Sequence, residues 1–285
     1  MRRYFISGGT GFIGREIVRQ LLEREDTESI ICLTRGVRHN HIPVGEKLLY
    51  WFGDIVDCKF PDGCEFTDLI HGANEVNDLL QPDQMKYYYT IVEGTNRVLK
   101  WAATTGIERT LVLSSGAVAR DTIYGRAKRQ SEFLCKAYGL NAKIARIFSV
   151  IGPEMPLNGQ YAAGRFVGMA LSEKRVRYYG GESVRTYLDV KDCAAYLLKI
   201  LDDAPPFKPV DVAGYDPIRI DELAHLVAKV FDVPCVKIEG PERVDHYLPD
   251  TAVHQTLTLT KSLERIRDHY KAISDLRGAN VESGT

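Results

Sequence analysis

The sequence predicts an α/β protein built on a doubly wound, parallel β-sheet, followed by a smaller region of mixed structure. Three observations support this fold class. Short apolar segments alternate with amphipathic helical segments through the first half of the 285 residues, and this alternation is typical of βαβ units with parallel strands. The first apolar segment leads through a glycine-rich turn directly into a helix. From residue 151 on, Pro and Gly interrupt the pattern and the expected elements become shorter.

In the first half we expect a helix that begins at residue 12, helices at 87–104 and 124–138, and strands at 3–7, 29–34, 47–52, 66–71, 110–114 and 142–148. Residues 29–34 are apolar without alternation, as expected for a strand covered on both faces. In the second half we expect helices at 165–172, 190–201 and 221–231, the last capped by Asp221, and short strands at 177–181 and 186–188. This pattern divides the chain into residues 1–150, residues 151–276 and a flexible tail, 277–285.

The composition limits the classes of partner. With 37 basic and 38 acidic residues the formal net charge is −1, so nothing predicts binding to nucleic acid or to an acidic membrane surface. No apolar run is long enough to cross a membrane, and the chain enters a strand at once, which leaves no room for a signal peptide. We therefore expect a cytoplasmic protein. The six cysteines form no CxxC motif, which favours reduced thiols and no metal site.

The turn after the first strand carries the first functional signal. Residues 8–14 read Gly-Gly-Thr-Gly-Phe-Ile-Gly. A pyrophosphate binds against backbone N–H groups at the start of a helix, where side chains would block it and the helix dipole favours an anion. The strand–turn–helix context favours a dinucleotide site over a glycine-rich turn without a ligand. Its predicted cofactor-binding residues are Gly8, Gly11, Phe12, Ile13 and Gly14.

The residues after the second strand indicate which dinucleotide binds. An NAD site usually places an acidic residue there to hold the ribose 2′-hydroxyl group. Here the strand ends in Thr34 and Arg35, with Arg38 close by and no acidic residue. Arg35 and Arg38 are suited to a 2′-phosphate, so we expect NADP(H) to be preferred, with NAD(H) possible. The alternative is that both arginines are solvated loop charges.

Two further strand ends are candidates for cofactor contacts. Asp54 and Ile55 follow the third strand, where the carboxylate could accept from an adenine amino group or belong to an ordinary turn. Gly72 and Ala73 follow the fourth strand, and such small residues let a cofactor approach. We expect the neighbouring His71 to be a hydrogen-bonded structural residue.

The candidate catalytic residues surround the end of the fifth strand. Ser114 and Ser115 end that strand, and Tyr124 and Lys128, four residues apart, face the same side of the next helix. An ammonium group and a cationic nicotinamide lower the pKa of a nearby tyrosine, which can then exchange a proton with a sugar hydroxyl or ketone while a hydride moves. Lys128 would also bind the nicotinamide ribose, and Ser115 would hydrogen-bond the reacting oxygen. In the alternative, Tyr124 packs and Lys128 lies in water.

Together these motifs resemble the extended short-chain dehydrogenases/reductases, in the NAD(P)-dependent epimerase/dehydratase family that acts on nucleotide-activated sugars. The resemblance covers most of the chain and rests on residues 8–14, 53–54, 71–73, 92–95, 114–115, Tyr124 with Lys128, 146–148, 151–153 and 185–192. It implies a Rossmann-like domain at 1–150 and a mainly substrate-binding region at 151–276. It also implies a homodimer formed through the helices at 87–104 and 124–138. The implied substrate is a nucleotide-diphosphate sugar held by Ser114, Ser115 and Arg185, although Arg185 could instead pair with Asp189 or Asp192.

Two departures from the family pattern bear on the reaction. Eight residues separate Ser115 from Tyr124, where the family usually has a longer segment, and this weakens the inference about the sugar. Gly116 and Ala117 occupy the positions where the family's 4,6-dehydratases carry an Asp-Glu pair. No carboxylate is available there to eliminate water, which disfavours 4,6-dehydration.

Two activities fit these residues. The first is NADPH-dependent reduction of a keto group, most simply at C4, on a nucleotide-linked deoxysugar, with Tyr124 as the proton donor. The alternative is NAD-dependent 4-epimerisation, which uses the same residues for oxidation and re-reduction. A non-catalytic NADP(H)-binding module is a third hypothesis, disfavoured because Ser115, Tyr124 and Lys128 are all present.

Overall fold

The computed structural model describes residues 1–36, 44–74, 83–157, 161–241 and 244–282. They form two compact units. Unit 1 comprises Met1–Phe148 and Cys193–Val212, and unit 2 comprises Ser149–Asp192 and Ala213–Thr285. The sequence analysis placed all of 151–276 in one region, whereas residues 193–212 belong to unit 1. Within the described residues, no helix combines the length and apolar character needed to cross a membrane.

Unit 1 contains a seven-stranded sheet in the order β11-β6-β5-β4-β1-β2-β3, and every neighbouring pair is parallel. This confirms the doubly wound α/β fold. Its strands are β1 (Arg2–Ser7), β2 (Thr27–Thr34), β3 (Leu48–Phe52), β4 (Asp68–His71), β5 (Arg109–Ser115), β6 (Ala142–Ile147) and β11 (Pro209–Val212). The first six match expected strands. β11 was not expected, because three half-buried residues followed by the buried Val212, at the edge of a sheet, show no clear periodicity.

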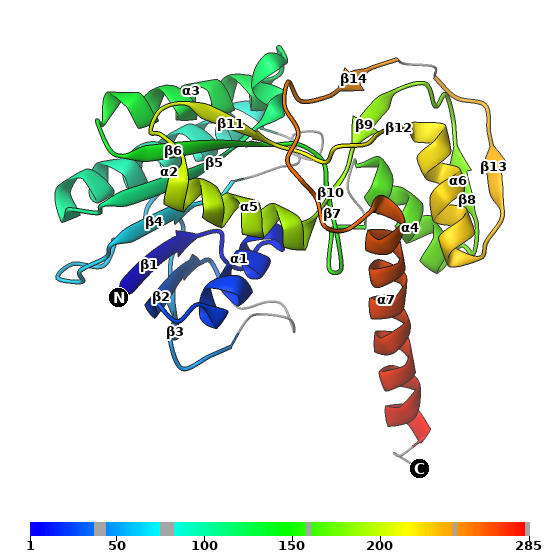
Figure 1. Cartoon of the computed structure of the whole chain (residues 1–285), viewed down its shortest axis with the longest axis horizontal. Helices are drawn as coiled ribbons and strands as arrows, with labels where there is room; N and C mark the ends of the chain where they lie inside the picture. The colour runs from blue at the N-terminus through cyan, green and yellow to red at the C-terminus, as the bar shows by residue number, and fades with distance from the viewer. Residues whose placement is uncertain (37–43, 75–82, 158–160, 242–243, 283–285) are drawn as a thin grey trace. The chain divides into compact units, whose positions relative to one another are not determined.

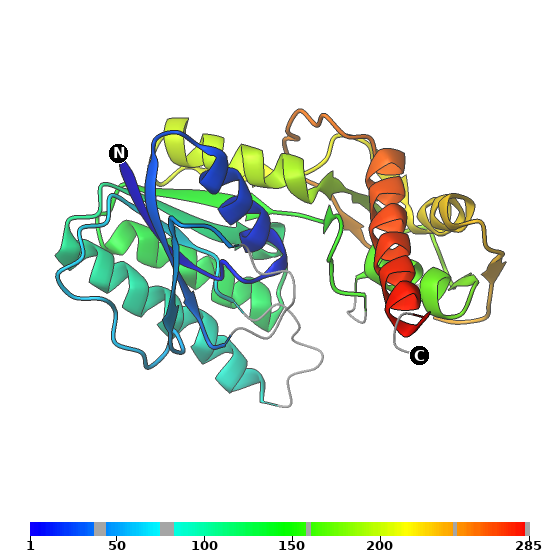
Figure 2. The same ribbon diagram turned by 90° about the horizontal axis from the view of Figure 1, so that it is seen from below.

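Helices cover both faces of this sheet. Figures 1 and 2 show α2 (Gln84–Thr105) and α3 (Ile123–Ala137) side by side on one face, with α1 (Phe12–Glu23) and α5 (Val190–Asp203) on the other. Under α2 the core is aromatic, and the ring centroids of Phe5 and Trp101 lie 4.7 Å apart. β4 is buried along its whole length, with the apolar Leu69 and Ile70 between the buried Asp68 and His71.

Unit 2 is small and mixed, as expected. Its helices are α4 (Ala162–Ser172), α6 (Ile220–Phe231) and α7 (Leu259–Glu282). Its strands form three small sheets: β7 (Val150–Ile151) with β10 (Leu188–Asp189), β8 (Val176–Tyr178) with β13 (Cys235–Lys237), and β9 (Val184–Thr186) between β12 (Pro217–Arg219) and β14 (His246–Tyr247). The parallel pairing of β7 with β10 joins segments far apart in the sequence.

Two expectations for unit 2 need correction. The predicted cap of α6 is wrong, because Arg219 is the N-cap residue and the Asp221 carboxylate pairs with Arg219 at 2.7 Å. The sequence analysis also missed α7, which continues through residues 277–282 of the expected tail. Of its side chains up to residue 276, whose burial the structure describes, few are buried, Leu263 and Ile266 among them, so its apolar face is too narrow to stand out in the sequence. α7 packs beside α6, where Arg267 donates to the carbonyl oxygen of Val230 at 3.2 Å.

Candidate functional site

The glycine turn between β1 and α1 is shaped by close backbone contacts. Gly8 has a φ of +82°, and a Cβ atom added there would lie 2.6–2.8 Å from the backbone of Gly72 and Ala73 at the end of β4. A Cβ atom at Gly14 would overlap the carbonyl group of Gly8. Side chains at these positions would therefore separate the turn from β4 and from its own helix.

The start of α1 fits a pyrophosphate group. Gly11 is its N-cap residue and makes no side-chain capping hydrogen bond, so the first-turn N–H groups receive no side-chain acceptor from it. Such N–H groups, at the positive end of the helix dipole, suit a phosphate anion. The predicted residues Gly8, Gly11, Phe12, Ile13 and Gly14 thus form a turn whose shape and donors fit a dinucleotide.

Arg35, predicted to select the nucleotide, follows β2, and Asp54, predicted to contact the adenine, follows β3. The Arg35 side chain is 68% exposed, and its guanidinium group lies 3.9 Å from the Asp54 carboxylate. The structure therefore brings together two residues that the sequence analysis treated separately. Arg38 lies outside the described residues. The Ile55 side chain is buried, and a Cβ atom on Gly94 of α2 would lie 2.8 Å from it, so this side chain serves packing.

Tyr124 and Lys128 lie on one side of α3, as predicted. Thr122 caps this helix by accepting from the backbone N–H of Gly125 at 3.0 Å. Lys128 is 2% exposed, and its Nζ atom donates to the carbonyl oxygen of Leu113 at 2.8 Å. The same Nζ atom lies 5.6 Å from the centre of the Tyr124 ring. The alternative in which Lys128 lies in water is wrong.

The short segment between Ser115 and Tyr124 forms a tight turn. Ser115 caps the 3₁₀-helix η2 (Gly116–Ala119), and its Oγ atom accepts from the backbone N–H of Ala117 at 3.2 Å. A Cβ atom on Gly125 would overlap the carbonyl oxygens of Ala117 and Arg120. This turn therefore packs directly on the first turn of α3. The segment between Ser115 and Tyr124, which is only eight residues long, is folded closely against the helix that follows it.

The sequence analysis missed a buried carboxylate beside these residues. Glu132 is 8% exposed and lies one helical turn after Lys128. It forms a bidentate ion pair with Arg146 of β6, with N–O distances of 2.7 and 2.9 Å. The Ser114 hydroxyl group is also buried and donates to Glu132 at 2.6 Å, so it faces α3 and is not presented to a substrate. The i, i+4 spacing from Lys128 was the signal that could have found Glu132.

Burial sets the electrostatics around Lys128. It lowers the pKa of the Lys128 ammonium group from 10.5 to about 7, and the negative charge of Glu132 opposes this effect. Burial, with a smaller contribution from Lys128, lowers the pKa of His71 to about 3. His71 is hydrogen-bonded through both ring nitrogens, to Ser7 Oγ at 2.7 Å and Thr95 Oγ1 at 3.0 Å. It is a neutral structural residue, as expected.

The aromatic ring of Phe148 lies against Gly116, the position where the sequence analysis noted that a carboxylate is absent. A Cβ atom on Gly116 would lie 2.5 Å from Cε1 and 2.8 Å from Cε2 of Phe148. An aspartate at this position would require the Phe148 ring to move. Ala117, the next residue, also has no acid–base group. The two residues that directly follow β5 therefore provide neither an acid nor a base.

In unit 2, Arg185 is already engaged by a carboxylate. Its Nη2 atom lies 2.8 Å from Asp245 Oδ2, and its guanidinium group lies 5.9 Å from the centre of the Tyr247 ring. Neither of the partners that the sequence suggested is used. Asp189 instead pairs with Arg265 at 2.6 Å, and Asp192 accepts from Thr256 and Leu257.

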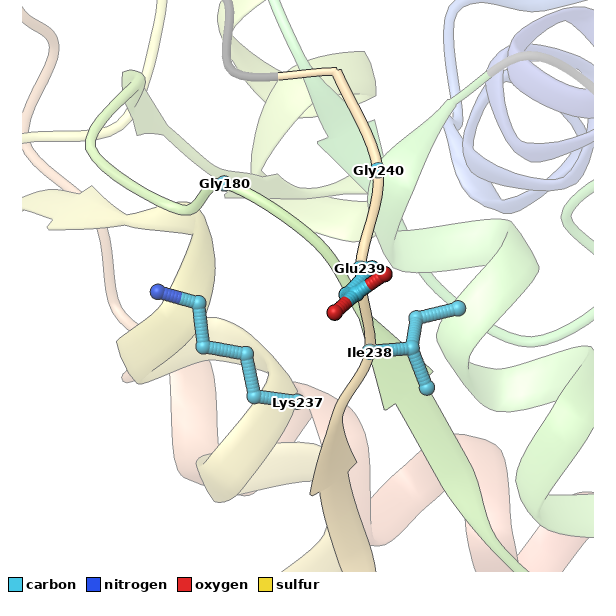
Figure 3. A pocket seen from close by; sticks show the side chains of 5 residues that line it. All are labelled: Gly180, Lys237, Ile238, Glu239 and Gly240. Atoms are coloured by element: carbon cyan, nitrogen blue, oxygen red, sulfur yellow. The ribbon is translucent and has the colours of Figure 1, made fainter.

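Unit 2 also contains an open pocket of about 410 Å³, lined by Gly180, Lys237, Ile238, Glu239 and Gly240. Figure 3 shows the side chains of Lys237 and Ile238 extending to opposite sides of the chain. Polar groups do not converge there, and none of the predicted site residues lines it. Among the described residues, no group of His, Cys, Asp or Glu is arranged to hold a metal ion.

Comparisons with known proteins identify the family of this chain. The NAD dependent epimerase/dehydratase family matches residues 4–213. UDP-glucuronic acid decarboxylase 5 from Arabidopsis thaliana is 25% identical over 296 residues, which cover 92% of this chain and 83% of that protein. The dTDP-glucose 4,6-dehydratase from Mycolicibacterium smegmatis is 27% identical over 230 residues, which cover 70% and 69%.

Solved structures share the fold. The UDP-glucose 4-epimerase from Thermotoga maritima superposes with a TM-score of 0.83 at 18% identity, covering 95% of this chain and 99% of that one. The dTDP-glucose 4,6-dehydratase DesIV from Streptomyces venezuelae, solved with NAD bound, also gives 0.83, at 22% identity and with 96% and 98% covered. Together with the match over 4–213, the glycine turn and the Tyr124–Lys128 pair show that the chain belongs to the NAD-dependent epimerase/dehydratase family of extended short-chain dehydrogenases/reductases.

Proposed function

We propose that the protein reduces a keto group at C4 of a nucleotide-activated deoxysugar, with NADPH as the reductant. The observation that carries this proposal is the buried Lys128 ammonium group, 5.6 Å from the Tyr124 ring at the end of β5. When bound, NADPH supplies the hydride. The Tyr124 hydroxyl donates a proton to the carbonyl oxygen, so the ketone becomes an alcohol, and Lys128 stabilises the tyrosinate left behind. Solvent then returns the proton to Tyr124.

The cofactor preference rests on the end of β2. The Gly8–Gly14 turn would hold the pyrophosphate, and the exposed Arg35 side chain is suited to an adenosine 2′-phosphate because a guanidinium group binds phosphate oxygens in bidentate fashion. Asp54 would lie beside the adenosine. The Ser115 hydroxyl would bind the reacting oxygen, and the nucleotide diphosphate of the substrate would displace Asp245 from Arg185.

Elimination of water, the reaction of a dehydratase, fits the residues at the end of β5 less well than reduction of a ketone does. A dehydratase must remove a proton and protonate a leaving hydroxyl group, and each step needs a positioned acid or base. At the end of β5 the Phe148 ring occupies the space beside Gly116, and Ala117 follows. Reduction of a ketone needs only a single proton transfer to the carbonyl oxygen, and the Tyr124 hydroxyl group suffices for that step.

The second candidate is NAD-dependent 4-epimerisation. One observation favours it: the Asp54 carboxylate lies 3.9 Å from the Arg35 guanidinium group and offsets part of its charge. A 2′-phosphate would then be bound less strongly, and NAD(H) would be accepted. Tyr124 and Lys128 would serve both the oxidation and the re-reduction in this reaction.

The test combines cofactor titration with a substrate panel. NADPH and NADH are titrated by fluorescence, and the protein is then assayed with 4-keto nucleotide sugars, nucleotide hexoses and UDP-glucuronate. Stoichiometric NADPH oxidation with a 4-keto sugar supports the reductase. Interconversion of C4 epimers without net cofactor use supports the epimerase, and release of CO2 from UDP-glucuronate would indicate the reaction named for the plant relatives.

Tyr124→Phe separates catalysis from binding. It removes the proton donor and keeps the ring, so turnover should fall by about 10²–10⁴-fold while the affinity for the cofactor stays unchanged. If the wild type and Tyr124→Phe were equally inactive on the whole panel but bound NADPH equally well, the non-catalytic module would be supported instead.

We also propose a homodimer formed through α2 and α3. These helices lie side by side (Figure 2) and expose Met85, Tyr89 and Phe133, whose exposed fractions are 72%, 58% and 62%. Exposed apolar side chains of this size on two neighbouring helices favour a protein contact. Sedimentation velocity should show a dimer, and Phe133→Glu should shift it to the monomer. The predicted cytoplasmic location remains to be tested by fractionation of cells.

A further inference from the structure

Glu132 connects α3 to two neighbouring strands of the sheet. Its carboxylate accepts from Ser114 on β5 at 2.6 Å and from Arg146 on β6 at 2.7 and 2.9 Å. Ser114 and Arg146 are direct partners in the parallel register of these strands. The carboxylate is therefore held from two adjacent strands, and a bidentate guanidinium pair also fixes its orientation.

The preceding turn of α3 is anchored one residue earlier on the same strand. Lys128 Nζ donates to the carbonyl oxygen of Leu113, the residue before Ser114. Consecutive residues of β5 thus hold Lys128 and Glu132, which lie four residues apart on α3. With Lys128 2% exposed and Glu132 8% exposed, the lysine and the carboxylate share one water-poor site. In such surroundings a fixed opposite charge counts for much more than at the surface.

We propose that Glu132 is a positioning residue for the Tyr124–Lys128 pair. Arg146 and Ser114 hold the Glu132 carboxylate in place, and this carboxylate stabilises the buried ammonium form of Lys128. This inference rests on the proposed function for its significance, because the ammonium group is the form that supports proton donation by Tyr124. It does not depend on which sugar is reduced.

The other groups around Lys128 do not supply this negative charge. On β4, burial keeps His71 neutral, with its pKa lowered to about 3. On α3, burial raises the pKa of the Cys135 thiol to about 12, which keeps it neutral as well. Tyr124 faces Lys128 from the preceding turn with its ring. Arg146 on β6 is cationic and is paired with Glu132. Of these groups, Glu132 is therefore the one whose negative charge balances the Lys128 ammonium group.

The test measures the titration of Lys128 directly, in the full chain without cofactor. Lysine labelled with ¹³C at Cε is followed by NMR against pH, and the Lys128 signal is assigned by its loss in Lys128→Arg. Glu132→Gln removes the negative charge and leaves Arg146 uncompensated, so the midpoint should fall by about one pH unit or more. Glu132→Asp keeps the charge, and its midpoint should stay near that of the wild type.

Two variants separate charge from packing. Ser114→Ala removes one hydrogen bond to the Glu132 carboxylate without changing any charge, so the midpoint of the Lys128 titration should not move. Arg146→Gln removes a positive charge, so the midpoint should rise, and this variant provides the test if Glu132→Gln does not fold. A role in packing alone would admit water around Lys128 and raise the midpoint in Ser114→Ala and Glu132→Gln alike.

A midpoint that is unchanged or raised in Glu132→Gln, or unchanged or lowered in Arg146→Gln, overturns the proposal. With an active substrate in hand, the high-pH limb of the activity profile should move down by the same amount in Glu132→Gln. If no nucleotide sugar is turned over, the proposed function fails, while the NMR midpoints still decide the role of Glu132.

Discussion

Replacing Gly8 by alanine tests whether the glycine turn at residues 8–14 depends on its close contact with the end of β4. Gly8 and Gly106 have similar positive φ values, +82° and +74°. They differ in their surroundings. A Cβ atom on Gly8 would lie 2.6–2.8 Å from the backbone of Gly72 and Ala73, whereas a Cβ atom on Gly106 would have nothing within 4 Å. Gly106→Ala is therefore a matched control for Gly8→Ala.

The structure predicts the difference between the two variants. An alanine in the left-handed region costs about 1–2 kcal/mol at either site. At Gly8 the added methyl group also meets backbone atoms, which cannot rotate away as a side chain would, and overpacking of this kind costs about 1–3 kcal/mol more. We expect Gly106→Ala to lower the free energy of unfolding by about 1–2 kcal/mol and Gly8→Ala by about 2–5 kcal/mol.

Urea denaturation followed by tryptophan fluorescence measures this difference. Trp51 and Trp101, which are the two tryptophans of the chain, both lie in unit 1 together with Gly8 and Gly106, so the signal reports on the unit that carries both variants. Affinity for NADPH should fall in Gly8→Ala and stay unchanged in Gly106→Ala. The reasoning would be refuted if Gly8→Ala cost no more free energy than Gly106→Ala, because the contact with β4 would then contribute nothing.

Three further predictions follow from the same structure. Gly116→Ala should lower the free energy of unfolding by about 1–3 kcal/mol by displacing the Phe148 ring; in a Phe148→Leu background the cost should be smaller, and equal costs in urea denaturation would contradict the contact. Arg35→Ala should weaken NADPH binding by about fivefold and leave NADH binding unchanged, while Arg35→Lys keeps the charge and most of the preference; equal losses for both nucleotides in fluorescence titration would argue against a 2′-phosphate contact. Lys128→Met tests the burial of an ammonium group whose pKa falls from 10.5 in the unfolded chain to about 7 in the folded one. Between these two pH values the unfolded chain binds more protons than the folded one. The free energy of unfolding of the wild type relative to Lys128→Met should therefore rise as the pH increases from 7 to 10.5 and should be constant below pH 7. A difference that does not vary with pH would show that Lys128 is not buried as a charge.

Much of the site could be predicted because its signals are local in the sequence. The glycines at 8, 11 and 14 stand in a strand–turn–helix segment, and the spacing of Tyr124 and Lys128 places them on one side of a helix whatever the rest of the chain does. The alternation of strands and helices predicted the parallel sheet in the same way. These features depend on backbone geometry within about a dozen residues, which periodicity and glycine positions report directly.

Other features are decided by residues that meet only in the folded protein. Glu132 is a buried counter-charge because β5 and β6 place Ser114 and Arg146 beside it. Gly116 is required because the Phe148 ring, from the end of another strand, lies against it. Arg185 pairs with Asp245, sixty residues away, and not with the nearby Asp189 or Asp192.

The sequence by itself therefore determined the fold class, the glycine turn at residues 8–14 and the placement of Tyr124 and Lys128 on one side of a helix, since each follows from the conformation of a short segment. Tertiary structure alone decided which charges are paired, which glycines are crowded and that β11 completes the sheet beside β6. Pairing and crowding depend on distances between segments far apart in the chain, and such distances are set by the packing of the whole unit rather than by any local pattern.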